Sequence, residues 1–219
     1  MSSSERGQKF FDAIARRYDR VYAPSSTESR ARMQRVLAAL PPASQILDLG
    51  VGTGRELSSL LDAGHTVVGL DFSPEMLAVC ARRARRISVV QGDFWDRLPF
   101  SDAAFDVVLA LHGTLAHPPS QDACGEVAVE VARVLRSGGV FVAEVPLPKW
   151  LDAARRSAGE GKVQRVGERG ALIEDGVTGA SILALILSVE DWQDALSPLF
   201  DAEMMGADGE ELFFAATKR

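Results

Sequence analysis

The chain of 219 residues has little cysteine, no long apolar run and a shortage of positive charge. Its two cysteines, Cys80 and Cys124, are too few for a disulfide framework and do not form a metal-binding CxxC pair. We therefore expect no metal site and a reducing, cytoplasmic environment. No apolar run approaches the ~18 residues that span a bilayer. The opening MSSSERGQKF lacks the apolar stretch of a secretory signal, so we expect no membrane association.

Acidic residues outnumber basic ones by 30 to 24, which gives a net charge of −6. Nucleic acid is not a favoured partner, because phosphate binding needs a basic surface. The segment ARRARR at 81–86 is the exception. We interpret it as the solvated end of a helix, where cations complement the helix dipole. A contact surface for tRNA or for a protein is the alternative.

Helical patterns precede the first strand. Apolar residues recur at helical spacing over 5–22 and again over about 27–40, and prolines follow both segments. The spacing predicts two helices, the first continuous over 5–22. Because both come before the sheet, we expect residues 1–42 to form a helical cap over the site that the sheet makes.

Short apolar runs and helical segments alternate over residues 43–148, which we expect to form a cofactor-binding core. The strand-like runs are QILDL, HTVVGLD, ISVVQGD, FDVVLAL and VFVAEVP. Strands separated by helices need crossover connections, so they pair in parallel in an α/β sheet with helices on both faces. Ser73 and Pro74 are typical of the start of one such helix.

The end of the chain departs from this alternation. ALILS near 184–188 is strand-like, and Ser188 with Asp191 indicates a capped helix after it. Too few residues separate FDAEMMG from ELFFAAT for a parallel crossover, so these two runs must form an antiparallel hairpin around Asp208-Gly209. Residues 149–183 form an insertion or substrate cap of unpredicted shape. Residues 184–219 supply the C-terminal strands and helix.

Three glycines, Gly50, Gly52 and Gly54, follow the first strand in ILDLGVGTG. Such a turn at the carboxyl end of a strand is where α/β sheets bind ligands, because missing β-carbons let the backbone approach them. The dinucleotide pattern G-x-G-x-x-G would need a glycine where Arg55 stands. Asp48 adds negative charge where a pyrophosphate would lie. An ammonium or sulfonium ligand is the better electrostatic match.

Two further carboxylates end the next strands. Asp71 stands where a carboxylate accepts hydrogen bonds from ribose hydroxyls, and Phe72 can lie against a purine. Asp93, in QGDFWD, can accept from an exocyclic adenine amine, with Phe94 beside the ring. Ribose, adenine and a cationic amino-acid part together describe S-adenosylmethionine (S-adenosyl-L-methionine).

Four segments, in order, resemble motifs of the class I S-adenosylmethionine-dependent methyltransferases. They are ILDLGVGTG, VVGLDFSPEML, VVQGDFWDRLPFSDAAFDVVLAL and EVARVLRSGGVFVAEVP, and the resemblance covers about residues 10–145. It implies a Rossmann-like, doubly wound, mostly parallel seven-stranded sheet whose last strand is antiparallel. It also implies methyl transfer from S-adenosylmethionine as the activity.

The resemblance also implies a set of cofactor-binding residues. The glycine loop borders the methionine part, Asp71 holds the ribose, and aromatic and apolar residues flank adenine. Tyr18, in AIARRYD, either folds over the cofactor or is a core aromatic, and Asp48 either contacts the cofactor or braces the loop. The expected set is Tyr18, Asp48, Gly50, Val51, Gly52, Gly54, Asp71, Phe72, Met76, Asp93, Phe94, Leu111 and His112.

The acceptor is less defined. Methyl transfer needs alignment and exclusion of water, and needs a general base only where the acceptor proton is hard to lose. His112 and His117 follow the fourth strand and titrate near neutrality, so both are candidate catalytic bases, while His117 can also simply pack in its loop. Oxygen, nitrogen and carboxylate acceptors stay open.

The segment after the fourth strand lacks the Asn/Asp-Pro-Pro-aromatic motif of family members that methylate adenine or glutamine amino groups, and no cysteine follows a proline. We therefore expect a small-molecule methyl acceptor, in a pocket that includes Phe10, Phe11, Tyr22 and Trp150. A nicotinamide-dependent oxidoreductase, a non-catalytic cofactor-binding or scaffold protein, and a tRNA or protein methyltransferase are the alternatives. The pattern predicts no oligomeric state.

Overall fold

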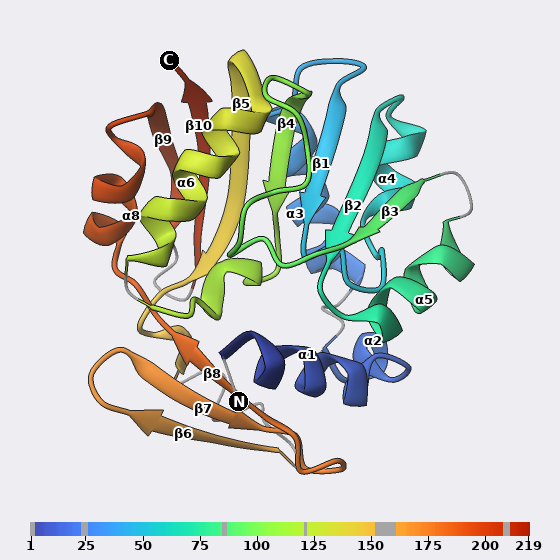
Figure 1. Cartoon of the computed structure of the whole chain (residues 1–219), viewed down its shortest axis with the longest axis vertical. Helices are drawn as coiled ribbons and strands as arrows, with labels where there is room; N and C mark the ends of the chain where they lie inside the picture. The colour runs from blue at the N-terminus through green and yellow to red at the C-terminus, as the bar shows by residue number, and fades with distance from the viewer. Residues whose placement is uncertain (1–2, 23–25, 85–86, 121, 152–160, 208–210) are drawn as a thin grey trace.

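The computed structural model describes residues 3–22, 26–84, 87–120, 122–151, 161–207 and 211–219 (Figure 1). The chain builds one large sheet of seven strands in the order β3-β2-β1-β4-β5-β10-β9, and a small sheet of three. The strands of the large sheet are β1 (Gln45–Leu49), β2 (Thr66–Asp71), β3 (Ser88–Gln91), β4 (Phe105–Ala110), β5 (Leu135–Pro146), β9 (Phe200–Ala207) and β10 (Glu211–Lys218).

The strand directions confirm the fold class predicted from the sequence. Strands β1 to β5 pair in parallel, whereas β10 runs antiparallel to both β5 and β9. The reversed last strand lies between β5 and β9 rather than at the edge. The connection predicted at Asp208-Gly209 lies outside the described residues. The strand order reverses between β1 and β4, and such a switch point opens a crevice at the carboxyl ends of the strands.

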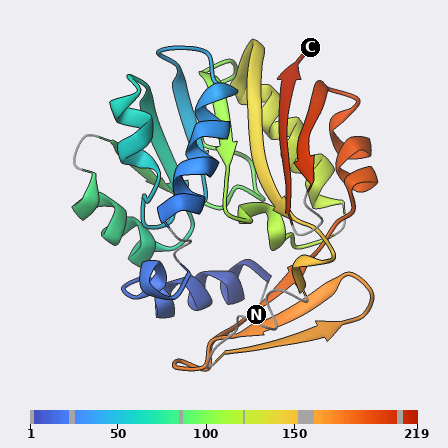
Figure 2. The same ribbon diagram turned by 180° about the vertical axis from the view of Figure 1, so that it is seen from behind.

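Helices cover both faces of this sheet (Figures 1 and 2). On one face α6 (Ala123–Val134) and α8 (Val189–Leu196) share a buried apolar cluster with Leu47 and Leu49 of β1. On the other face α3 (Ser26–Ala38), α4 (Leu57–Asp62) and α5 (Pro74–Arg83) share a second cluster with Ile46. Because side chains alternate along a strand, the apolar run of β1 buries residues on both faces.

Two helix starts follow from local capping. The Ser73 side chain accepts a hydrogen bond from the Met76 backbone N–H, with Pro74 at the first position of α5. Ser188 and Asp191 form a reciprocal capping box at the start of α8. Both caps confirm the sequence prediction.

The single helix predicted over 5–22 is wrong. Helix α1 (Ser3–Ile14) ends in a turn, and α2 (Tyr18–Tyr22) follows as a separate short helix. Within that turn, Arg17 forms an ion pair with the buried Asp175 of the small sheet. A tertiary contact of this kind outweighs the weak helical preference of the segment.

The insertion contains an antiparallel sheet of β6 (Lys162–Val166), β7 (Gly170–Glu174) and β8 (Ser181–Leu185). The strand expected near 184–188 is β8, which begins earlier, so the boundary drawn at residue 183 falls inside it. The strand β5 likewise begins at Leu135, directly after α6, and not at Val140. Helix α1 packs on β8 through Phe10 and Ile182, and both lie at the carboxyl ends of the parallel strands.

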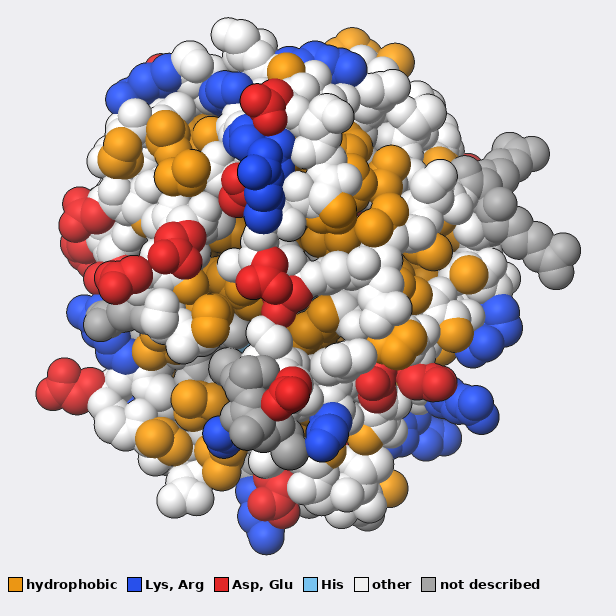
Figure 3. Space-filling view, in the orientation of Figure 1, with side chains coloured by type: hydrophobic (Ala, Val, Ile, Leu, Met, Phe, Trp, Pro, Cys, Tyr) orange, Lys and Arg blue, Asp and Glu red, His pale blue; other side chains and the backbone are white. Residues whose placement is uncertain are grey.

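Charged side chains of both signs are interspersed with apolar patches over the face shown in Figure 3. Arg82 is exposed, and Arg83 donates to the Thr53 backbone carbonyl and pairs with Asp19. Arg85 and Arg86 lie outside the described residues. Within the described ranges, no helix has the length and apolar character needed to cross a membrane.

Candidate functional site

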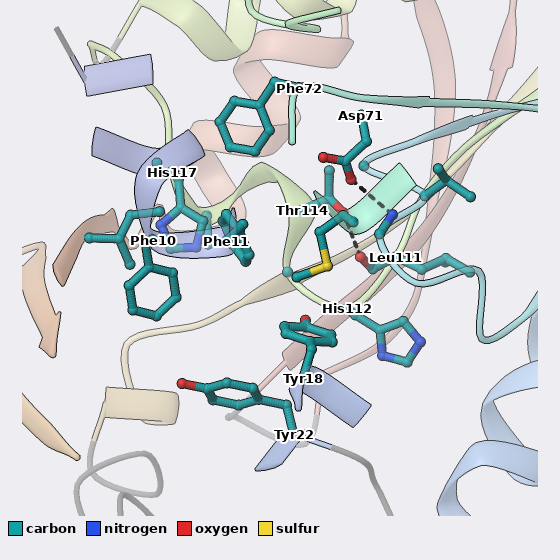
Figure 4. Close-up of a pocket in the computed structure, with 18 of the residues that line it drawn as sticks. Phe10, Phe11, Tyr18, Tyr22, Asp71, Phe72, Leu111, His112, Thr114 and His117 are labelled. Carbon is teal, nitrogen blue, oxygen red and sulfur yellow. Dashed lines mark hydrogen bonds between the residues drawn. The ribbon is translucent and has the colours of Figure 1, made fainter. Parts of the chain in front are cut away.

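A cavity lies where β1, β2 and β4 end, closed by α1, α2 and the small sheet (Figure 4). In this view Phe10, Phe11 and His117 lie on one side, Asp71 and Leu111 on the other, and Tyr18 and Tyr22 below. Most of the predicted residues line it, namely Tyr18, Asp48, Gly50, Val51, Gly52, Asp71, Phe72, Met76, Phe94, Leu111, His112 and His117. Phe10, Phe11, Tyr22 and Trp150, predicted for the acceptor pocket, line it as well.

The glycines of the loop after β1 serve different purposes. Gly50 and Gly52 have left-handed φ angles of +63° and +54°. A β-carbon on Gly50 would lie 2.6 Å from Thr114 Cγ2, whereas one on Gly52 would meet nothing nearer than 3.8 Å. Gly50 thus allows close packing of two loops, and Gly52 leaves space at the cavity wall.

Two predicted binding residues, Gly54 and Asp93, do not line the cavity. A β-carbon on Gly54 would lie 2.6 Å from Leu57 Cδ1 and 2.8 Å from Cys80 Sγ, so this glycine makes room for helix packing. The Asp93 carboxylate accepts a hydrogen bond from the Trp95 backbone N–H at 3.0 Å and stabilises the turn after β3. Trp95, which the sequence did not single out, lines the cavity instead.

The Asp71 carboxylate joins the end of β2 to the glycine loop. Its Oδ2 accepts from the Gly52 N–H at 2.8 Å, and its Oδ1 accepts from the Ser73 N–H at 2.9 Å. The residue is 5% exposed, and burial raises its pKa to about 6 although these hydrogen bonds oppose the shift. It is therefore mostly ionised at neutral pH, and each oxygen keeps a lone pair for a ligand.

The Asp48 carboxyl is 7% exposed, lines the cavity, and makes no hydrogen bond to any residue that the structure describes. Burial raises its pKa to about 8, and the charges of Glu56 and Asp71 add to the shift. A buried carboxyl without a partner is costly to ionise. A cation at this wall of the cavity would restore its charged form.

The backbone of His112 adopts a left-handed φ of +56°, which is unusual for a residue other than glycine. Its N–H donates to Glu144 Oε2 at 3.1 Å, and its ring Nε2 lies 2.6 Å from Glu56 Oε1. Glu144 is 1% exposed and also accepts from Arg32 Nε at 2.7 Å. This network holds the loop after β4 in place. The one sign of it in the sequence is Glu144, a charged residue within the apolar run VFVAEVP.

His117 lies in the loop after β4, close to the small sheet. Its ring Nδ1 is 3.0 Å from the carbonyl oxygen of Leu183 in β8. The Phe11 ring meets it edge-on, with centroids 5.8 Å apart. Burial lowers the pKa of His117, and the hydrogen bond to Leu183 opposes the shift in part, so the ring is neutral at pH 7.

Polar contacts join the helical cap to the glycine loop and to the start of α5. The Arg55 guanidinium lies 5.2 Å from the centroid of the Tyr18 ring, a cation–π contact. Asp19 accepts from Thr53 Oγ1 at 2.6 Å, and Asp12 Oδ1 accepts from Ser73 Oγ at 2.6 Å. The sequence gave no sign of these contacts, because their partners are far apart along the chain.

Comparison with known proteins agrees with the methyltransferase motifs seen in the sequence of the core. Residues 46–139 match the model of a family described as a methyltransferase domain. Over 135 residues the chain is 38% identical to the demethylmenaquinone methyltransferase of Mycolicibacterium gilvum, a match that covers 60% of this chain and 56% of that protein. The chain thus spans little more than half the length of the curated relatives that it matches.

Solved structures extend the likeness to nearly the whole fold. The PH0226 protein of Pyrococcus horikoshii superimposes with a TM-score of 0.76 at 21% identity, covering 92% of this chain and 98% of that one. The 1,6-didemethyltoxoflavin-N1-methyltransferase of Burkholderia thailandensis, solved with its acceptor and S-adenosylhomocysteine, gives 0.68 at 21% identity, covering 98% and 88%. At this identity the likeness concerns the fold.

Proposed function

The chain belongs to the class I S-adenosylmethionine-dependent methyltransferases, and from this premise we propose that it methylates a small-molecule acceptor in the cavity. The cofactor is S-adenosylmethionine. When bound, it supplies a methyl group already activated by a sulfonium. The task of the chain is then to align the acceptor with that methyl group and to exclude water.

Asp48 is the single observation that carries the choice of ligand. Its buried carboxyl lines the glycine loop without a hydrogen-bond partner among the described residues. A pyrophosphate would add negative charge beside it and raise the cost of ionisation. The ammonium or sulfonium of S-adenosylmethionine would pair with the ionised carboxylate, so the residues present fit this cofactor.

The other cofactor contacts follow the walls of the cavity. Asp71 would accept hydrogen bonds from the ribose hydroxyls, because its carboxylate retains free lone pairs. Phe72, Met76 and Phe94 would flank adenine, and Leu111 would lie beside the methionine part. What supports these roles is that all five side chains line one cavity.

Aromatic residues of the cap favour a flat, apolar acceptor. Phe10, Phe11, Tyr18, Tyr22 and Trp150 line the cavity on the side of α1, α2 and the segment after β5. Rings of this kind stack on planar molecules. The likeness to a demethylmenaquinone methyltransferase supports the same class of acceptor, since a menaquinone precursor carries a flat quinone ring.

Calorimetric titration with S-adenosylmethionine, and separately with NADH, tests the proposal. We expect binding of the first alone. Asp71→Ala should weaken it by about 10-fold or more, because a buried charged acceptor is lost. Gly52→Val should block it sterically, and the exposed Asp62→Ala is the matched control that should leave it unchanged.

Unchanged affinity in Asp71→Ala and Gly52→Val would place the cofactor elsewhere and contradict the proposal. Binding of NADH in preference to S-adenosylmethionine would favour an oxidoreductase. A chain that binds the cofactor but methylates no member of a broad acceptor panel would instead be a cofactor-binding scaffold.

A further inference from the structure

Titratable groups lie at both ends of the cavity. Asp48, Glu56 and Asp71 lie on or beside the glycine loop, at the proposed cofactor end. At the cap end, within the described part of the chain, His117 is the lining side chain that can take up a proton near neutrality. The chemistry of this end of the cavity therefore depends on the state of one imidazole.

The hydrogen bond of His117 fixes its tautomer. A backbone carbonyl only accepts, so the Nδ1 that lies 3.0 Å from the Leu183 oxygen must carry the proton. The neutral ring then has its free lone pair on Nε2. That atom makes no hydrogen bond to any described residue, and His117 lines the cavity. The edge-on contact with Phe11 holds the ring plane.

Other candidate bases are engaged or remain protonated. Burial raises the pKa of both Tyr18 and Tyr22, so neither phenol loses its proton at neutral pH. His112 pairs with Glu56, which lies beside the glycine loop at the proposed cofactor end. Asp71 lies at that end as well, where its remaining lone pairs are assigned to the ribose.

Among the described residues, no charged side chain contributes to the pKa shift of His117. The elements packed against it are α1, through Phe11, and β8, through Leu183. The shift in the pKa of His117 has two causes, burial and the carbonyl hydrogen bond, and no charged side chain of the described residues contributes. An acceptor that enters beside this ring thus meets a neutral base in apolar surroundings.

We propose that His117 is the general base of the transfer and that the acceptor is a flat, uncharged molecule carrying a hydroxyl or ring N–H. This inference rests on the proposed function. His117 Nε2 takes the proton from the acceptor while the acceptor oxygen or nitrogen forms its bond to the methyl carbon. The carbon–sulfur bond breaks and its electron pair stays on sulfur. The imidazolium then returns its proton to water.

Nitrogen-15 NMR of the full chain, labelled at histidine, tests the tautomer without any acceptor. The chain has three histidines, so His117→Asn identifies the signal by its loss. We expect a neutral ring at pH 7, protonated on Nδ1, with a pKa below the usual range of histidine because the ring is buried. A ring protonated on Nε2, or charged at pH 7, would overturn the assignment.

Methylation of two probe phenols tests the role. The acceptors are 2-naphthol, a weak acid, and 4-nitrophenol, a stronger acid that is largely ionised at about pH 8. His117→Asn keeps an amide that can donate to Leu183 but removes the base. With 2-naphthol we expect kcat to fall about 10²-fold or more with KM changed less than about 3-fold, and activity to recover at higher pH. With 4-nitrophenol the fall should stay below about 5-fold.

Equal losses with both phenols, or no loss with 2-naphthol, would show that His117 is not the base. A wild-type chain that binds S-adenosylmethionine but methylates neither probe would overturn the acceptor class and leave the cofactor assignment standing. A chain that does not bind S-adenosylmethionine would overturn the proposed function itself. Unchanged cofactor affinity and thermal unfolding of His117→Asn show that the variant is folded.

Discussion

Replacing Asp48 by asparagine is expected to stabilise the chain and to weaken its binding of S-adenosylmethionine. The substitution keeps the shape of the side chain and removes its charge. In the folded chain burial raises the pKa of Asp48 from 3.8 to about 8. At pH 7 the folded state therefore holds a proton that the unfolded chain has released.

The size of the effect follows from that difference. Stability falls wherever the folded state binds more protons than the unfolded state, so the stability linked to Asp48 is complete below pH 3.8 and is lost as the pH rises to about 8. About three pH units separate pH 7 from 3.8, at ~1.4 kcal/mol per unit, which gives a cost of at most about 4 kcal/mol. We expect Asp48→Asn to recover about 2 to 4 kcal/mol at pH 7, a rise in Tm of about 5 to 15 °C.

Thermal unfolding of both chains between about pH 4 and pH 9 is the assay. The gain should be close to zero at the acid end and should grow with pH, while the exposed Asp62→Asn should show no such trend. Calorimetry in two buffers of different ionisation enthalpy should show release of close to one proton on cofactor binding at pH 7 in the wild type, and none in Asp48→Asn. Affinity should fall by about 10-fold or more. An Asp48→Asn chain of equal or lower stability at pH 7 would refute the reasoning.

Three further substitutions separate packing from binding. Gly50→Ala should lower the free energy of unfolding by about 2 to 4 kcal/mol, because the new β-carbon would lie 2.6 Å from Thr114 Cγ2 at a left-handed φ. Gly52→Ala should lower the free energy of unfolding by only about 1 kcal/mol yet weaken cofactor binding. Urea unfolding measures the first effect and calorimetry the second. If the two glycine substitutions had the same effects in both assays, the reasoning would be wrong. Arg17→Gln removes the cation beside buried Asp175 and should cost about 2 kcal/mol at neutral pH. Against the effect of burial, hydrogen bonds from Thr178 and the contact with Arg17 lower the pKa of Asp175. The loss should therefore fade as the pH falls below about 4, and a loss independent of pH would count against the ion pair.

Local signals in the sequence were reliable for strands and helix starts. Ser73 and Ser188 cap helices through groups three residues away, so a short stretch contains the whole cause. The break after Ile14 had no such signal. Its cause is the pairing of Arg17 with Asp175, which lie 158 positions apart.

The carboxylates at strand ends also show which features are local and which depend on distant contacts. Asp71 is the last residue of β2 and Asp93 lies just after β3, and the sequence gave no reason to separate them. In the folded chain Asp71 bonds to the glycine loop across the sheet, whereas Asp93 turns back to the Trp95 backbone. The direction in which each carboxylate points depends on the neighbouring loop, and the residue pattern of one strand does not specify that loop.

The sequence by itself indicated a mostly parallel sheet with one reversed strand, and the glycine loop after its first strand, because periodicity, caps and turn residues act over a few residues. Only the tertiary structure decided the walls of the cavity. The cap contacts the glycine loop through Asp19 and the start of α5 through Asp12. His117 acquires its tautomer from Leu183, 66 positions away. Burial, and with it the raised pKa of Asp48, exists only once these distant segments have excluded water together.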